Sequence, residues 1–251
     1  MIDIHTHILP AVDDGAKDLE QSLAMLRMAA DAGTTDAVAT CHSNPRYIFD
    51  PQLMEMRIAE LQTAAGITVR IHYGCELHLT LDGIENAMRS PDEYSIAHKG
   101  YLLVEFSDLL IPRTSSEILS RMLDRGLRPI IAHPERNPLL RTRLTELEGW
   151  IELGCATQVT GQSLMGRFGK SAKVSAHELI TKGLVHFLAS DAHDLEHRPP
   201  VLNDVRQYIE ETFDQDTAMR LLEENPRAVL EGGPLASGVM PLRKKPWFSL
   251  W

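Results

Sequence analysis

The segment MIDIHTHILPAVDDG (residues 1–15) decides the fold, because it combines a buried strand with chemically active side chains. Ile2 and Ile4 alternate with polar residues, which is typical of a short strand. His5 and His7 follow, and in an extended backbone their side chains project to the same side and can bind one cation. Two surface histidines at a chain end would show the same pattern. The rest of the chain has to distinguish a metal site from this alternative.

Six more short apolar runs follow the first strand, starting roughly 27 to 34 residues apart and separated by segments of helical length. This alternation is typical of βαβ units in a parallel sheet, and seven units indicate a closed or nearly closed α/β barrel. The predicted strands are Ile2–His5, Asp36–Thr40, Val69–Gly74, Tyr101–Phe106, Arg128–His133, Ala156–Thr160 and Val185–Asp191.

Helices are predicted between these strands. Asp18 can cap the first, whose apolar stripe ends before Gly33. The others are expected at Leu53–Ala65, Leu81–Met88, Ser115–Arg125, Leu144–Leu153, Ala172–Lys182 and Val201–Thr212, of which Leu81–Met88 has the weakest pattern.

Length and composition agree with one barrel domain. The chain has 251 residues, close to the length of about 250 that α/β barrels typically reach. Its net charge of −10 argues against general nucleic-acid binding, and no apolar run is long enough to cross a membrane. Because the first strand begins at Ile2, a signal peptide has no room before it, and we expect a cytoplasmic protein.

The three cysteines do not indicate a disulfide framework or a thiolate zinc site, because their number is odd and no C-x-x-C occurs. Thiol phosphatases need a cysteine with an arginine after five intervening residues. Cys41 has Arg46 one position too close for this, and neither Cys75 nor Cys155 has an arginine at that place.

Nine side chains with metal-binding atoms lie at or just after the carboxyl ends of the predicted strands. In a barrel these ends open on one face, so residues far apart in sequence converge there. The set is too large for one ion and sufficient for two or three, which together can clamp a phosphoryl group and activate water. Mixed imidazole and carboxylate ligands suit manganese, iron or zinc. The nine residues are His5, His7, Asp14, His42, Glu76, Glu105, His133, Asp191 and His193.

Arginines follow two of these strands. Arg136 comes three positions after His133, and Arg198 five positions after His193. A guanidinium group binds two phosphate oxygens at once, so both are candidate phosphate ligands, with surface ion pairing as the alternative. Arg46 is a weaker third candidate.

The C-terminal segment, residues 232–251, is treated separately as a basic and aromatic tail. It mixes Gly, Pro and Ser and ends in RKKPWFSLW. Such a tail can bind a membrane surface or a partner, or its aromatic side chains can pack on the preceding domain, residues 1–231.

The ordered set of motifs resembles the PHP (polymerase and histidinol phosphatase) superfamily, and more narrowly the bacterial manganese-dependent protein tyrosine phosphatases encoded with capsule and exopolysaccharide systems. The resemblance extends from residue 1 to about residue 230. Its motifs are DIHTHILP at 3–10, DDG at 13–15, GCE at 74–76, VEFS at 104–107, IAHPER at 131–136, ASDAH at 189–193, RPP at 198–200 and NPRA at 225–228.

The resemblance implies a distorted (βα)7 TIM-like barrel of the PHP fold that holds three divalent ions, with manganese expected. By similarity, Arg136 and Arg198 would contact the substrate phosphate. The ligand sets would be His5, His7, Glu76 and Asp191 for the first ion, Glu76, Glu105 and His133 for the second, and Asp14, His42 and His193 for the third.

The implied activity is hydrolysis of phosphotyrosine by a metal-bridged hydroxide. The implied substrate is the tail of a membrane-bound bacterial tyrosine kinase that controls polysaccharide export. Two alternatives stay open: a small-molecule phosphatase, such as one for histidinol phosphate, and a non-catalytic module that keeps its metal ligands for stability. At residues 41–43 this chain has Cys-His-Ser where many relatives have Pro-His-His, which leaves narrow substrate choice open.

Overall fold

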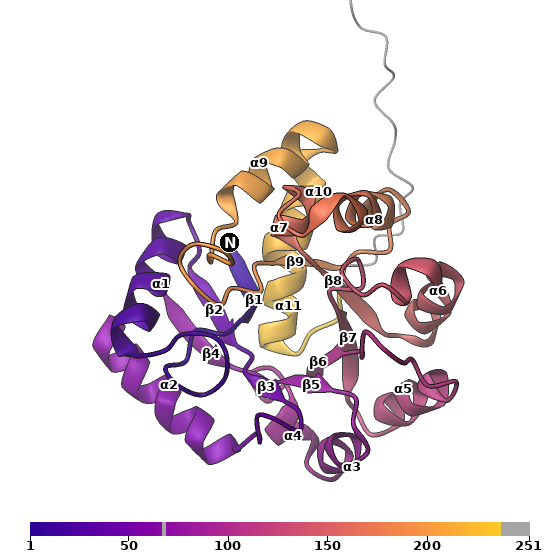
Figure 1. Ribbon diagram of the computed structural model, residues 1–251, viewed down its shortest axis with the longest axis horizontal. Helices are drawn as coiled ribbons and strands as arrows, with labels where there is room; N and C mark the ends of the chain where they lie inside the picture. The colour runs from indigo at the N-terminus through magenta and orange to yellow at the C-terminus, as the bar shows by residue number, and fades with distance from the viewer. Residues whose placement is uncertain (67–68, 237–251) are drawn as a thin grey trace, which may run out of the picture.

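Parallel strands form the centre of the molecule, as the sequence predicts (Figure 1). The computed structural model describes residues 1–66 and 69–236, and within these it contains nine strands. They are β1 (Ile2–Thr6), β2 (Asp36–Ala39), β3 (His42–Ser43), β4 (Arg70–Tyr73), β5 (Glu76–His78), β6 (Tyr101–Glu105), β7 (Arg128–Ala132), β8 (Ala156–Thr160) and β9 (Phe187–Ala189).

The second and third predicted strands correspond to β2 and β4, and each is followed by a short additional strand, β3 or β5, that the sequence did not predict. The described strands form a three-stranded sheet, β1-β2-β4, and a six-stranded sheet, β3-β5-β6-β7-β8-β9. Gly74, between β4 and β5, lies against β2, and a Cβ atom there would come within 2.7 Å of Val38 Cγ1. The division of the strands between two sheets distorts the barrel.

The first and last strands close the ring. The backbone N–H of Asp191 donates to the His5 carbonyl at 2.9 Å, and the N–H of His7 donates to the Ala192 carbonyl at 2.8 Å. Thr6 and Ala192 form a parallel bridge. The carboxyl ends of all strands consequently open at one end of the barrel.

Helices surround the strands (Figure 1). Asp18 caps the first, accepting a hydrogen bond from the Gln21 N–H at 2.8 Å. All seven predicted helices are present, with small shifts at their ends. The helices are α1 (Leu19–Asp31), α2 (Pro51–Ala65), α3 (Leu81–Arg89), α4 (Pro91–Tyr94), α5 (Ser115–Asp124), α6 (Leu144–Leu153), α7 (Gly161–Leu164), α8 (Gly169–Thr181), α9 (Asn203–Thr212), α10 (Gln215–Met219) and α11 (Asn225–Glu231), with a 3-10 turn at Leu140–Thr142 and a π-helical turn at Arg220–Glu224.

Helix α11 covers the end of the barrel opposite the strand carboxyl ends. In Figure 1 it lies over the centre of the ring, and Val229 from this helix joins the apolar cluster that fills the interior, with Ile2, Val38 and Phe187 among its members. The chain after α11 is held at the same end, where the Tyr101 hydroxyl donates to the Gly233 carbonyl at 2.8 Å. Apolar side chains therefore fill the interior of the barrel, and the end at which the strand carboxyl ends open is not covered by α11.

Two sequence predictions concern the chain as a whole. Among the described residues, none of the helices is long and apolar enough to cross a membrane. The basic and aromatic tail was predicted for residues 232–251, and its residues 237–251 lie outside the described residues.

Candidate metal centre

The fold brings all nine predicted metal ligands together at the open end of the barrel. His5, His42, Glu76 and Glu105 belong to β1, β3, β5 and β6, while His133, Asp191 and His193 follow the ends of β7 and β9. His7 and Asp14 come from the segment after β1. Their ligand atoms form four overlapping groups, and within each group these atoms lie within 4.8 Å of one another. The groups are His7, Asp14, His42 and His193; His5, His7 and Glu76; His5, His133 and Asp191; and His42, Glu76 and Glu105.

Glu76 occupies the middle of the cluster. Its Oε1 lies 3.2 Å from His5 Nε2 and 3.0 Å from His133 Nε2. Its Oε2 lies 3.3 Å from His7 Nε2 and 3.0 Å from His42 Nδ1. One carboxylate thus faces four imidazoles with both oxygens, which is the arrangement that a ligand shared between two ions needs.

Asp14 marks the more exposed side of the cluster. Its Oδ1 lies 3.3 Å from His42 Nε2 and 3.6 Å from His193 Nε2. The rings of His7 and His193 are 3.9 Å apart between centroids, so His7 joins this group as well as the one around Glu76. The group around Asp14 therefore contains one residue, His7, more than the set that the resemblance implies for the third ion.

Three histidines have their Nδ1 atoms engaged by groups that are not proposed to bind metal: two side chains outside the nine and one backbone carbonyl. His5 Nδ1 lies 3.0 Å from Gln158 Oε1, and His7 Nδ1 lies 2.8 Å from Asp13 Oδ2. His193 Nδ1 lies 3.0 Å from the Asp191 carbonyl. An acceptor at Nδ1 keeps the proton there and leaves the Nε2 lone pair for a metal ion. Sequence reasoning missed Gln158, because a glutamine inside an apolar strand gives no sign of which side it faces.

The backbone is strained at two of the nine positions. His133 has φ of 33° and Asp191 has φ of 52°, in the left-handed region that non-glycine residues rarely adopt. Both follow directly after barrel strands, where an ordinary extended residue would continue the strand. Such strain persists where surrounding structure enforces it, and it concentrates at functional sites.

The buried charges stabilise one another. Burial alone would raise the pKa of Glu76, but the imidazoles of His5, His133 and His42 hold it well below its usual value. Burial lowers the pKa of His42, yet Asp14 and Glu76 outweigh it and raise the pKa to about 10. The carboxylates therefore stay ionised, as metal ligands must be.

Several atoms in the cluster have no hydrogen-bond partner although they are buried. They are Glu76 Oε2, Asp191 Oδ1, His42 Nδ1 and His193 Nε2. Although His42 Nδ1 and Glu76 Oε2 are 3.0 Å apart, the pair lacks hydrogen-bond geometry. Buried polar atoms without partners are costly unless something else satisfies them. These lone pairs, all on nitrogen or oxygen, fit divalent cations.

The two predicted phosphate-binding arginines lie at the edge of the cluster. Arg136 and Arg198 both donate hydrogen bonds to Asp191 Oδ2, and the Arg136 guanidinium lies over the Phe168 ring at 4.2 Å. Phe168 was not identified from the sequence. Glu105, His133, Arg136 and Phe168 line part of a cavity of about 250 Å³ in front of the centre.

Other residues lie outside the cluster. Arg46 does not join it, since its guanidinium lies over the Tyr47 ring at 5.0 Å. His197 has an 85% exposed side chain and pairs with Asp194. His78 contacts Glu105 at 3.1 Å through Nδ1. Burial raises the pKa of the Cys41 thiol well above its usual value, which agrees with the absence of a thiol-phosphatase motif at this position.

Comparison with known proteins gives consistent matches over most of the chain. CapC of Staphylococcus aureus is 32% identical with all of both chains covered. The tyrosine-protein phosphatase YwqE of Bacillus subtilis is 33% identical, with 89% of each chain covered, and the tyrosine-protein phosphatase CpsB of Streptococcus pneumoniae is 31% identical over 92% of this chain and 98% of its own.

Solved structures point to the same relatives as the sequence comparison. A crystal structure from work on YwqE of B. subtilis and CpsB of S. pneumoniae, described there as metal-dependent tyrosine phosphatases, superposes with a TM-score of 0.88 at 31% identity, covering 97% of this chain and 99% of the other. The lactonase Lmo2620 of Listeria monocytogenes, at 13% identity and a TM-score of 0.58, shares the fold alone. The sequence profile of the CpsB/CapC family, described as capsular polysaccharide synthesis, matches residues 1–231. The chain therefore belongs to the CpsB/CapC family of capsular polysaccharide synthesis proteins.

Proposed function

We propose that this protein is a metal-dependent phosphatase that hydrolyses phosphotyrosine in proteins. The observation that carries the proposal is the cluster of nine nitrogen and oxygen ligands around Glu76, with Arg136 and Arg198 at its edge. The names of CpsB and YwqE as tyrosine-protein phosphatases support the same activity here.

The nine residues would hold three divalent ions, for which manganese is our choice and iron or zinc the alternatives. A ligand set of imidazoles and carboxylates without thiolate suits all three metals. We assign His5, His7, Glu76 and Asp191 to the first ion, Glu76, Glu105 and His133 to the second, and Asp14, His42 and His193 to the third. His7 lies close enough to the last group to contribute there too.

Bound divalent ions would supply Lewis acidity, which activates water near neutral pH and neutralises charge on the phosphoryl group. Arg136 and Arg198 would bind the phosphate oxygens through their planar guanidinium groups. Gln158 and Asp13 would keep His5 and His7 in the tautomer that presents Nε2 to the ions.

The substrate is expected to be an aryl phosphate. A phenol has a pKa of about 10, well below that of an aliphatic alcohol, so a tyrosinate can leave with little help from a proton donor. The cavity beside Arg136 and Phe168 has room for an aromatic ring next to the phosphate. Aryl phosphates should therefore react faster than alkyl phosphates of similar size, and equal rates would contradict this.

We further propose that the substrate is the phosphorylated tail of a membrane-bound tyrosine kinase of polysaccharide export, and that the phosphatase works in the cytoplasm. Residues 1–231, the span of the family match, would form the catalytic domain.

The test combines activity with metal content. Metal-stripped protein is supplied with Mn²⁺ and assayed on p-nitrophenyl phosphate, a phosphotyrosyl peptide and histidinol phosphate. We expect metal-dependent release from the first two. The His5→Ala variant should lose at least about 100-fold in turnover, comparable with removing one group that stabilises the transition state. It should also bind fewer ions by elemental analysis.

His197→Ala is the matched control, because this exposed histidine lies on the same face outside the cluster. It should keep both turnover and metal content. A folded, metal-loaded protein that is inactive on both aryl substrates would contradict the proposal, and hydrolysis of histidinol phosphate alone would replace it with a small-molecule phosphatase.

A further inference from the structure

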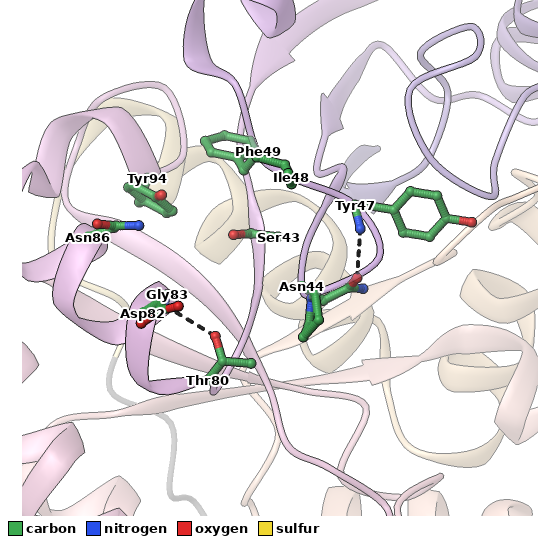
Figure 2. Close-up of a pocket in the computed structure, with 11 residues that line it drawn as sticks. Ser43, Asn44, Tyr47, Ile48, Phe49, Thr80, Asp82, Gly83, Asn86 and Tyr94 are labelled. Atoms are coloured by element: carbon green, nitrogen blue, oxygen red, sulfur yellow. Dashed lines mark hydrogen bonds between the residues drawn. The ribbon is translucent and has the colours of Figure 1, made fainter.

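A second cavity opens beside the metal centre. It has a volume of about 310 Å³ and lies between β3, the loop from β3 to α2, and helices α3 and α4. Figure 2 shows Phe49 and Ile48 on one side of it, Thr80 and Asp82 on the opposite side, and Ser43 between them. Its volume is at the lower end of the range for ligand pockets, about 300 to 1,000 Å³.

A single short strand, β3, separates this pocket from the metal centre. His42 and Ser43 are consecutive in β3, so their side chains project to opposite sides: His42 joins the cluster and Ser43 lines the pocket. Tyr47, from the following loop, stacks against His42 with ring centroids 6.0 Å apart and planes 14° from parallel. The pocket and the metal centre are therefore neighbours across β3, and Tyr47, which lines the pocket, also contacts the metal cluster.

The walls of the pocket are mostly apolar and partly open to solvent. Ile48, at the edge of the pocket, is 91% exposed. Phe49 lies behind it and packs on Tyr94, with ring centroids 5.1 Å apart. Deeper in, the buried residues Ser43 and Tyr94 line the pocket together with Asn86. An occupant would thus meet apolar surface near the opening and neutral polar groups inside.

The charge of the pocket is negative. Among the described lining residues Asp82 is the one carboxylate, and none is a lysine or arginine. Asp82 is in the first turn of α3, where the helix dipole favours an ionised carboxylate. No ion pair within residues 1–66 and 69–236 engages it. A second phosphate or a carboxylate would be repelled here, whereas a cationic group would be attracted.

We propose that this pocket is a substrate subsite for a lysine or arginine side chain close to the phosphotyrosine. The inference rests on the proposed function and adds a sequence preference to it. The aliphatic stem lies against Ile48 and Phe49, and the cationic head reaches Asp82. Long basic side chains bury their stems in this way while the charged head stays partly hydrated.

The test uses phosphotyrosyl peptides that carry lysine, norleucine or glutamate at each position within three residues of the phosphotyrosine. Norleucine has the same stem as lysine without the charge. For the metal-loaded wild-type protein, lysine should exceed norleucine at one position by about fivefold in kcat/KM, the factor for ~1 kcal/mol from a solvent-accessible ion pair. Glutamate should be the poorest. The preference should weaken at high salt.

Two variants of α3 separate the pocket from general electrostatics. Asp82→Asn should bring the ratio of lysine to norleucine close to one. Glu85→Gln removes one charge from an exposed residue of the same helix that does not line the pocket, and it should keep the ratio. On the apolar side, Ile48→Ser should lower kcat/KM for both the lysine and the norleucine peptide at that position.

The outcomes also separate this inference from the proposed function. Turnover of p-nitrophenyl phosphate, which has no neighbouring side chains, reports the phosphatase activity alone. If it is hydrolysed while lysine, norleucine and glutamate peptides react equally at every position, the subsite is refuted and the phosphatase stands. Norleucine equal to lysine, or loss of the ratio in Glu85→Gln, also refutes a cationic subsite. Failure of every substrate would refute the proposed function itself.

Discussion

Asp13 connects two of the proposed ligands although it is not one itself. Its Oδ2 accepts a hydrogen bond from His7 Nδ1 at 2.8 Å and another from the His42 backbone N–H at 3.1 Å. It therefore holds the His7 ring in a fixed position relative to the first residue of β3. The sequence shows Asp13 and Asp14 as equal neighbours, and only the path of the loop distinguishes the residue that faces the cluster from the one that supports it.

Asp13→Asn should weaken metal binding by about 10- to 100-fold, as expected for loss of a carboxylate behind a metal-binding histidine. Titration of the metal-stripped protein against a competing chelator measures this. Asp18→Asn is the control, since it changes another carboxylate near the N-terminus at a helix cap, where asparagine serves equally well. Unchanged affinity in Asp13→Asn would show that His7 needs no such support.

His186 gives a residue-level prediction away from the metal centre. Burial, with a smaller effect of Arg220, lowers its pKa to about 4. Its Nδ1 accepts a hydrogen bond from the Thr157 N–H at 3.2 Å, so the folded protein needs the neutral ring. In the unfolded chain the pKa is about 6.5.

Between pH 6.5 and 4 the unfolded chain therefore binds more protons at this residue, and the stability that His186 contributes above pH 6.5 is lost as pH falls. With metal-loaded protein, the melting temperature of the wild type should fall more steeply over this window than that of His186→Gln. Parallel curves for the two proteins would contradict the assignment.

At the scale of elements, the strands could be predicted because each is a short apolar run between helical segments, and all seven predicted positions contain a strand. The short strands β3 and β5 could not be predicted. Each has only two or three residues, and they pair with each other and with β6 in a different sheet from β2 and β4. Helices α10 and α11 were also missed, since they are short and joined by a π-helical turn.

Gly74 should be intolerant of a side chain, because a Cβ atom would lie 2.7 Å from Val38 Cγ1 and 3.1 Å from Thr40 Cγ2. Gly74→Ala should destabilise the protein by roughly 1–3 kcal/mol, typical of overpacking, and lower the melting temperature by several degrees. Gly149→Ala is the matched control: it lies within α6 with nothing within 4 Å of its Cβ position. It should stabilise by about 0.5–1 kcal/mol. Equal effects of the two changes, measured calorimetrically, would refute the steric argument.

At the scale of the whole molecule, the proposed ions should contribute strongly to stability. The cluster exists only in the folded chain, so metal binding favours folding by about 4 kcal/mol when free metal is 1,000 times the dissociation constant. The melting temperature should therefore rise with added Mn²⁺ and fall on chelation. His5→Ala should show a smaller rise than the wild type, and a melting temperature independent of metal would contradict the assigned sites.

The barrel could be predicted from the count of strands, but the helix that covers one of its ends, α11, could not. Seven apolar runs at regular spacing already indicate a ring. That α11 covers one end depends on Val229, which contacts residues from distant strands and has no distinguishing sequence pattern. The pocket beside β3 was missed for a similar reason: Ile48 and Asp82 are 34 positions apart and look like ordinary surface residues.

The pairing of β1 with the chain after β9 also bears on synthesis of the protein. The first proposed ligand, His5, leaves the ribosome early, but its neighbours Asp191 and His193 emerge only near the end. A growing chain therefore carries an incomplete set of ligands for almost the whole of translation. Tight metal capture, and with it phosphatase activity, should begin only when nearly the entire polypeptide has been released, so truncated chains would remain inactive in the cell.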